Sequence, residues 1–137
     1  MKAGVSLIAA ISTVCLATTA LAHHSFSMFD RDKTVTLTGM VKELEWTNPH
    51  AWLHMMVQDE KTGQPVLWSF EMGGVGQISG WGWKPDSVKP GDKVSVQMHP
   101  LKDHSHGGQY MAITLADGRM LGSNQDAARR PTQNVIQ

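Results

Sequence analysis

Two adjacent histidines, His23 and His24, occupy the chemically most distinctive position in the sequence. They follow Ala20-Leu21-Ala22, a small-x-small pattern typical of signal-peptidase cleavage. Cleavage after Ala22 gives His23 a free α-amino group, which can chelate a metal together with the ring Nδ1. Imidazole and amine nitrogens suit copper(II) or nickel(II), and copper(II) has the higher intrinsic affinity. The pattern predicts a copper site at the mature N-terminus; the alternative is a solvated pair that merely suits the peptidase.

A third histidine, His50, lies in the short connection WTNPHAW between two segments of alternating apolar residues. Asn48 can hold a turn there and Pro49 stiffens it, so the imidazole should point outward in a defined direction. We interpret Asn48, His50 and Trp52 as candidate ligand contacts. Large aromatic side chains dominate core area, so Trp46 is interpreted as a core residue that closes one end of the fold.

A carboxylate, Glu71, stands in the apolar segment PVLWSFEM beside Trp68. If Glu71 is buried it needs a partner, and a ring N–H of His50 or His24 can supply one. It would then act as a copper ligand or as the group that orients one. The alternative places Glu71 in solvent. The predicted metal set is therefore His23, His24, His50 and Glu71, and the predicted ligand contacts are Asn48, Trp52 and Trp68.

The remaining histidine cluster comprises His99, His104 and His106. His-x-His on an extended segment places both rings on one side, but the surrounding Gly-rich sequence favours a solvated loop. The only cysteine, Cys15, precedes the predicted cleavage site, which excludes the common zinc-finger sites from the mature chain. The sequence contains no G-x-S-x-G, phosphate-binding glycine loop or H-E-x-x-H. It therefore predicts a protein that is not an enzyme; a copper centre, or His50 acting with Glu71, is the weakest alternative.

Residues 1–22 have the organisation of a signal peptide, with Lys2 before an apolar stretch from Val5 to Leu16. That stretch is short for a membrane span, so an uncleaved anchor is the minor alternative. The sequence predicts a periplasmic protein with no stable membrane insertion after cleavage. Its 12 basic and 12 acidic side chains leave no excess to hold a phosphate backbone, which disfavours nucleic acid as a partner.

Five segments with strand periodicity follow, at residues 34–46, 51–59, 65–72, 87–98 and 110–121, and the last two contain predicted turns at Pro90-Gly91-Asp92 and Asp117-Gly118. Gly39 inside the first segment predicts a bend or bulge. The Gly-rich stretch between the third and fourth segments is compatible with one short helical turn. We expect an all-β fold over residues 23–121, a small five-stranded barrel like the oligonucleotide/oligosaccharide-binding (OB) fold, with an open sandwich as the alternative. Residues 122–137 are polar and aperiodic, which predicts a flexible tail.

The combination of AHHSF, TLTGMVKELEWTNPHAWLH, WSFEM, GW-x4-VKPGDKVSV and ITLADGR resembles a bacterial family of secreted proteins of unknown function. The resemblance covers residues 23–121. It implies a periplasmic barrel of OB type and brings no established activity or ligand. The sequence thus predicts an exported binding protein that takes a metal ion, copper, or a small ligand. The alternative is a metal-free module that binds a protein, glycan or small molecule through an aromatic rim of Trp46, Trp52, Trp81 and Trp83.

Overall fold

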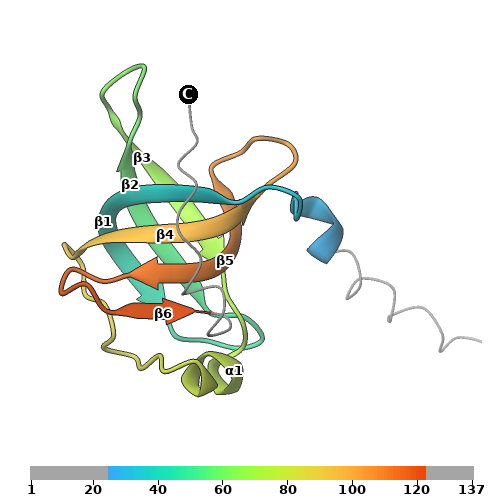
Figure 1. The fold of residues 1–137 in the computed structure, drawn as a ribbon, viewed down its shortest axis with the longest axis vertical. Helices are drawn as coiled ribbons and strands as arrows, with labels where there is room; N and C mark the ends of the chain where they lie inside the picture. Colours follow the sequence, from blue (N-terminus) through green and yellow to red (C-terminus); the bar gives the residue numbers. More distant parts are fainter. Residues whose placement is uncertain (1–24, 123–137) are drawn as a thin grey trace, which may run out of the picture.

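The computed structural model of the protein describes residues 25–122 (Figure 1). The predicted signal peptide, His23 and His24, and residues 123–137 of the predicted tail lie outside the described residues. In chain order the elements are η1 (Ser25–Met28), β1 (Val35–Glu45), β2 (Trp52–Gln58), β3 (Pro65–Glu71), α1 (Val75–Gly80), β4 (Lys93–Pro100), β5 (Gly107–Thr114) and β6 (Met120–Gly122).

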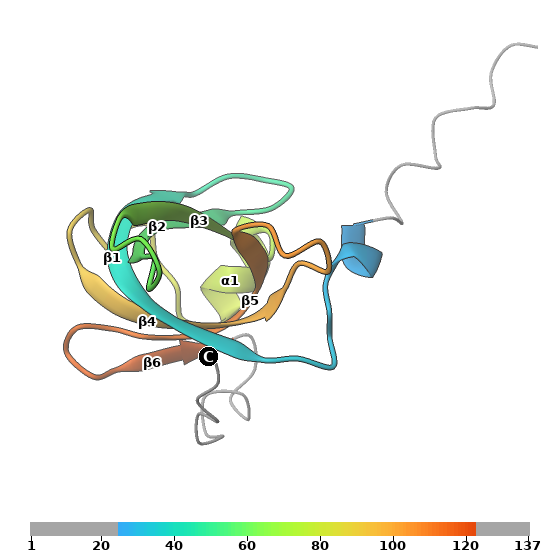
Figure 2. The ribbon, with the colours of Figure 1, turned by 90° about the horizontal axis from the view of Figure 1, so that it is seen from above.

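The strands form one sheet in the order β3-β2-β1-β4-β5-β6. A parallel contact between β3 and β5, in which Ser69 pairs with Gly107 and Glu71 with Gln109, joins the sheet to itself. The first five strands therefore close into a barrel, and α1 lies at one opening of the ring (Figure 2). This topology confirms the predicted five-stranded OB-like barrel with a short helix between the third and fourth strands, and the open-sandwich alternative is wrong.

Strand β1 is shared by two neighbours. Val35–Met40 pairs with β4, and Met40–Glu45 pairs with β2. Gly39 lies where the partners change, and a Cβ atom there would be 2.4 Å from the carbonyl oxygen of Met56. Glycine is required at this point because the two backbones approach closely. The sequence predicts a bend or bulge at Gly39, whereas the register shift itself falls between Val41 and Glu43.

The barrel interior is filled by alternate residues of the strands, as the period-two pattern predicts. Trp83, which was predicted as part of an aromatic rim, lies in the core, where it is only 1% exposed. Its indole N–H donates to the hydroxyl of Tyr110 at 3.2 Å, and that hydroxyl donates to the carbonyl of Leu121 at 2.7 Å. Trp46 and Trp81 are half-buried and pack against the same core. The core placement of Trp46 confirms its prediction, but the aromatic-rim hypothesis is wrong for Trp83.

The fifth predicted segment divides at a tight turn. Gly118 adopts a positive φ of 83°, and the N–H of Leu115 donates to the carbonyl of Arg119. Two strands result, β5 and the short β6, because the Asp117-Gly118 turn reverses the chain. At the other end of the chain, Phe29 is buried and pairs with Leu101, so the arm that precedes β1 lies against the barrel. No helix among residues 25–122 is long and apolar enough to cross a membrane.

Candidate functional site

Strands β1, β2 and β3 are neighbours in the sheet, and their side chains on the side away from the core form three rows. In the register of β1, β2 and β3, Trp52 stands between two carboxylates and His54 between a carboxylate and a serine, while three apolar side chains form the last row. Alternate residues of a strand point to opposite faces, so all of these share one side of the sheet. We call them the outward face: Glu45, Trp52 and Glu71; Glu43, His54 and Ser69; Met40, Met56 and Leu67.

One edge of the outward face carries an ion pair between His50 and Glu71. His50 Nδ1 lies 2.5 Å from Glu71 Oε1, with the imidazole 36% and the carboxylate 11% exposed. The sequence analysis proposed His50 or His24 as the partner of Glu71, and the structure shows the contact with His50. An ionised carboxylate can only accept, so Nδ1 carries the donated hydrogen. In the neutral ring, the lone pair on Nε2 is then free to contact a ligand.

The loop that carries His50 is fixed to the start of α1. Asn48 Oδ1 accepts a hydrogen bond from the backbone N–H of Val75 at 3.0 Å. The N–H of Ala51 donates to the carbonyl of Gly73, also at 3.0 Å. The Asn48–Pro49 peptide bond is cis. Asn48 was predicted as a ligand contact; in the structure its side-chain oxygen satisfies a backbone donor in the first turn of the helix and positions the His50 loop.

The two predicted tryptophan contacts, Trp52 and Trp68, lie on opposite faces of the sheet. Trp52 belongs to the outward face, and its ring is nearly parallel to that of His54, with the ring centroids 6.4 Å apart. Trp68 packs partly against the core, and its ring lies 5.1 Å from that of His106. The structure therefore groups Trp52 with Glu71 across the strand pair and separates Trp68 from them.

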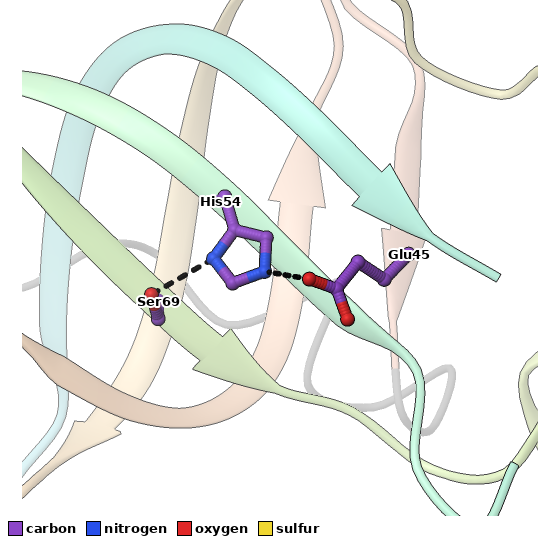
Figure 3. A network of polar contacts seen from close by, with 3 residues as sticks. All are labelled: Glu45, His54 and Ser69. Atoms are coloured by element: carbon purple, nitrogen blue, oxygen red, sulfur yellow. Dashed lines mark hydrogen bonds and ion pairs between the residues drawn. The ribbon is translucent and has the colours of Figure 1, made fainter. Parts of the chain in front are cut away.

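At the centre of the outward face, His54 is held from both sides (Figure 3). Its Nδ1 lies 2.8 Å from Ser69 Oγ, and its Nε2 lies 2.9 Å from Glu45 Oε1. The imidazole is 17% and the Glu45 carboxylate 45% exposed. A serine, an imidazole and a carboxylate in this order are the arrangement of an activated nucleophile.

Sequence reasoning missed this trio, although part of it was accessible. The alternation of β2 and β3 places residues 54 and 69 on one face, and the hairpin, in which Gln58 pairs with Pro65, sets the register in which they face each other. The third member, Glu45, depends on the pairing of β1 with β2. A register shift between Val41 and Glu43 interrupts that pairing, and simple alternation does not reveal it.

The three histidines of the β4–β5 region do not gather. His99 Nδ1 contacts the carbonyl oxygen of Lys33 at 2.7 Å. His106 lies against Trp68, and His104 is exposed with a φ of 62°. Within residues 25–122, no group of three or more His, Cys, Asp or Glu side chains is placed to hold a metal ion. Of the predicted copper set, only His50 and Glu71 fall in the described chain, and they are in contact.

Charge on the outward face has a single sign. Its ionised residues are Glu43, Glu45 and Glu71, and none of its nine side chains is Lys or Arg. Phosphate backbones bind through Lys and Arg contacts that release counterions. The outward face therefore carries acidic groups and no basic side chain of that kind.

Comparisons with known proteins identify a family and one similar fold. Residues 10–110 match the model of a family described only as a family of unknown function, DUF6152. No curated protein matches the chain. Among solved structures, the chain is similar to Rim1, a mitochondrial single-stranded DNA binding protein from S. cerevisiae. The two share 15% sequence identity over 61% of this chain and 92% of that chain, with a TM-score of 0.46.

Proposed function

We propose that this chain, which belongs to the family of unknown function DUF6152, is an exported periplasmic protein that binds copper(II) through its mature N-terminus and His50. The observation that carries the proposal is the contact between His50 Nδ1 and Glu71 Oε1. Metal-ligating histidines almost always donate their other ring N–H to a carboxylate, a carbonyl or water. That arrangement fixes the tautomer and directs the free nitrogen of the ring toward the ion.

His50 supplies one nitrogen, and the other ligands must come from elsewhere because the described residues hold no set of three. The N-terminal amine and ring of His23, with His24 beside it, complete a nitrogen-rich set that favours copper(II). In this assignment Glu71 orients His50. It does so from a sheltered position, with only 11% of its side chain exposed.

The described arm introduces a competing imidazole. The N–H of Lys102 donates to the carbonyl of Met28 at 2.9 Å, and Phe29 pairs with Leu101. The chain therefore enters the fold beside the β4–β5 loop, which carries His104 and His106. A test of the copper site must separate His50 from these two loop histidines.

The test begins with the exported protein, whose first residue is determined by N-terminal sequencing. Copper(II) is then titrated into the wild type and into His23→Ala, His50→Ala and a double His104→Ala/His106→Ala variant, with circular dichroism confirming the fold of each. We expect His23→Ala and His50→Ala to weaken copper binding and the loop variant to leave it unchanged. A mature chain that starts elsewhere, unchanged affinity in His23→Ala, or loss of affinity only in the loop variant would overturn this assignment.

A second candidate function is recognition of a small organic ligand by Trp52, without metal. It is favoured by the distribution of the tryptophans: Trp83 is in the core, Trp46 and Trp81 pack against it, and Trp52 stands on the outward face. A half-buried indole beside carboxylates, such as that of Trp52, offers an apolar surface and attraction for a cation. Tryptophan fluorescence during a screen of small amines and oligosaccharides tests this candidate. A ligand response that disappears in Trp52→Phe supports it, and a response that persists there contradicts it.

A further inference from the structure

We propose that Ser69 is a nucleophilic serine, activated by His54 and Glu45, that takes up the acyl group of an activated ester. The proposal is independent of the copper site, since none of its three residues belongs to the predicted copper set. It rests on the two consecutive contacts of His54: 2.8 Å from Nδ1 to Ser69 Oγ and 2.9 Å from Nε2 to Glu45 Oε1 (Figure 3).

Only one assignment of hydrogens satisfies both contacts for a neutral imidazole. The Glu45 carboxylate can only accept, so Nε2–H of His54 donates to it. Nδ1 is then unprotonated and accepts the hydroxyl hydrogen of Ser69. This places a base on the nucleophile and a carboxylate on the far side of the base, as in serine triads, with the two ring nitrogens exchanged, since those triads use Nε2 toward the serine.

The sheet holds this geometry rigidly. His54 and Ser69 are cross-strand partners in β2 and β3, and Glu45 comes from the adjacent β1. Sites built on strands keep their geometry more precisely than sites built on loops. The imidazole is largely sheltered at 17% exposure, and the serine is half-buried. A small reagent can therefore approach Ser69 without a rearrangement of the barrel.

Apolar side chains beside the trio indicate the substrate class. The row next to His54 and Ser69 consists of Met40, Met56 and Leu67, and Met40 and Leu67 are exposed. Leu67 precedes Ser69 by two residues on β3 and shares its face. An acyl group placed on Ser69 Oγ can lie against this row and remove apolar surface from water. The fitting substrate is an ester with a short apolar acyl chain.

The step is a redox-neutral acyl transfer. Ser69 Oγ attacks the ester carbonyl, a new C–O bond forms, and the bond to the alcohol oxygen breaks. The hydroxyl proton passes to His54 Nδ1 and from there to the departing alkoxide, which leaves as an alcohol. Water can later attack the acyl-serine and lose a proton to Nδ1. The bond between the acyl carbon and Ser69 Oγ then breaks, Nδ1 returns the proton to Oγ, and a carboxylic acid leaves.

The second half of this cycle should be slow. The backbone N–H of Ser69 already donates to the carbonyl of His106 at 3.2 Å, so it does not face a developing oxyanion. Loss of one oxyanion donor typically costs about 10²- to 10³-fold in rate. Both half-reactions lack this donor, but an activated ester has a better leaving group than the acyl-serine, so we expect the acyl-serine to accumulate rather than turn over quickly.

The experiment treats the full exported protein with p-nitrophenyl acetate and follows it by intact mass and peptide mapping. Ser95 is the internal control, because it is also a strand serine but bonds Thr38 Oγ1 at 2.6 Å instead of a histidine. General-base assistance contributes about 10²- to 10⁴-fold, so Ser69 should acetylate at least about 10²-fold faster than Ser95. Ser69→Ala should remove the label, and Ser95→Ala should not.

Two further variants separate activation from simple exposure. His54→Ala should lower Ser69 acetylation by about 10²-fold or more, and added imidazole should restore part of the rate. Glu45→Gln should lower the rate while leaving the circular dichroism spectrum unchanged. Equal labelling of Ser69 and Ser95, or an acetyl group that maps to a histidine in Ser69→Ala, would overturn the proposal. An unchanged rate in a folded His54→Ala variant would overturn it equally.

Discussion

His50 and His54 each have a carboxylate partner, but they use different ring nitrogens. Glu71 contacts Nδ1 of His50, whereas Glu45 contacts Nε2 of His54. The second nitrogen of His54 is taken by Ser69. We propose different roles for the two imidazoles on this basis: His50 binds a ligand, and His54 activates its serine neighbour.

Under the copper proposal, the Glu71 carboxylate should matter to copper affinity as the group that orients His50. Glu71→Gln removes the charge that accepts from His50 Nδ1 and leaves the shape of the side chain. Substitution of such an orienting group typically costs about 10- to 100-fold in metal affinity. Copper(II) titration should show this loss with no change in the amplitude of thermal unfolding. Unaltered affinity in Glu71→Gln would remove the orienting role, and Glu43→Gln, on the same face, is the matched control.

Tyr110 should contribute to stability through its hydroxyl. It accepts from Trp83 and donates to the carbonyl of Leu121 in the buried core. Tyr110→Phe leaves the indole N–H without a partner, and an unsatisfied buried donor costs about 1–3 kcal/mol. Urea unfolding should show this decrease in the free energy of unfolding with an unchanged slope. Equal midpoints for the two proteins would mean that water satisfies the indole.

The Tyr110 hydroxyl also predicts that the free energy of unfolding depends on pH in alkaline solution. Burial raises the pKa of Tyr110 above its ordinary value of 10.0. Below pH 10.0 both the folded and the unfolded chain keep the proton, so the contribution of the Tyr110 hydroxyl to stability is fully present. As the pH rises beyond it the unfolded chain loses the proton first, and stability falls. The fall should be smaller in Tyr110→Phe. Because the chain has one tyrosine, tyrosinate absorbance reports this group alone; its appearance at the ordinary pH without unfolding would contradict the prediction.

At the scale of elements, the strands were predictable and their less regular features were not. Alternation located β1 to β5 and placed Trp52 and His54 on one face, because a half-buried strand must alternate. The core position of Trp83 was missed, since it follows a Gly-rich segment that has no periodicity. The structural role of Asn48 was also missed, because its partner Val75 lies in a different element. Local patterns carry no information about such contacts.

The bend of β1 gives a prediction for two glycines. Gly39→Ala places a methyl group 2.4 Å from the Met56 carbonyl oxygen, which can move only with its strand. Overpacking of this kind typically costs about 1–3 kcal/mol. The control is Gly76→Ala in α1, where nothing lies within 4 Å of the new atom. Helix propensity there predicts a gain of up to about 1 kcal/mol. Thermal and urea unfolding compare the two, and equal effects would refute the close-approach argument.

At the scale of the whole molecule, the outward face carries three glutamates and no lysine or arginine. The balance of 12 basic and 12 acidic residues offers no compensating excess. We therefore expect no measurable binding of single-stranded oligothymidylate at physiological salt, because there is little counterion release to drive it. Fluorescence anisotropy of a labelled oligonucleotide checks this expectation. Tight binding that weakens steeply with added salt would contradict it.

A chain is synthesised from its N-terminus, so the parallel contact between β3 and β5 can form only late in folding. The β2–β3 hairpin joins neighbouring segments, whereas Ser69 can pair with Gly107 only after β4 and its loop have appeared. Local contacts form before long loops close, because closure costs chain entropy. Until then β3 presents an open edge to any other extended chain. This interval, rather than the finished barrel, is where the molecule is most exposed to aggregation and most in need of a chaperone.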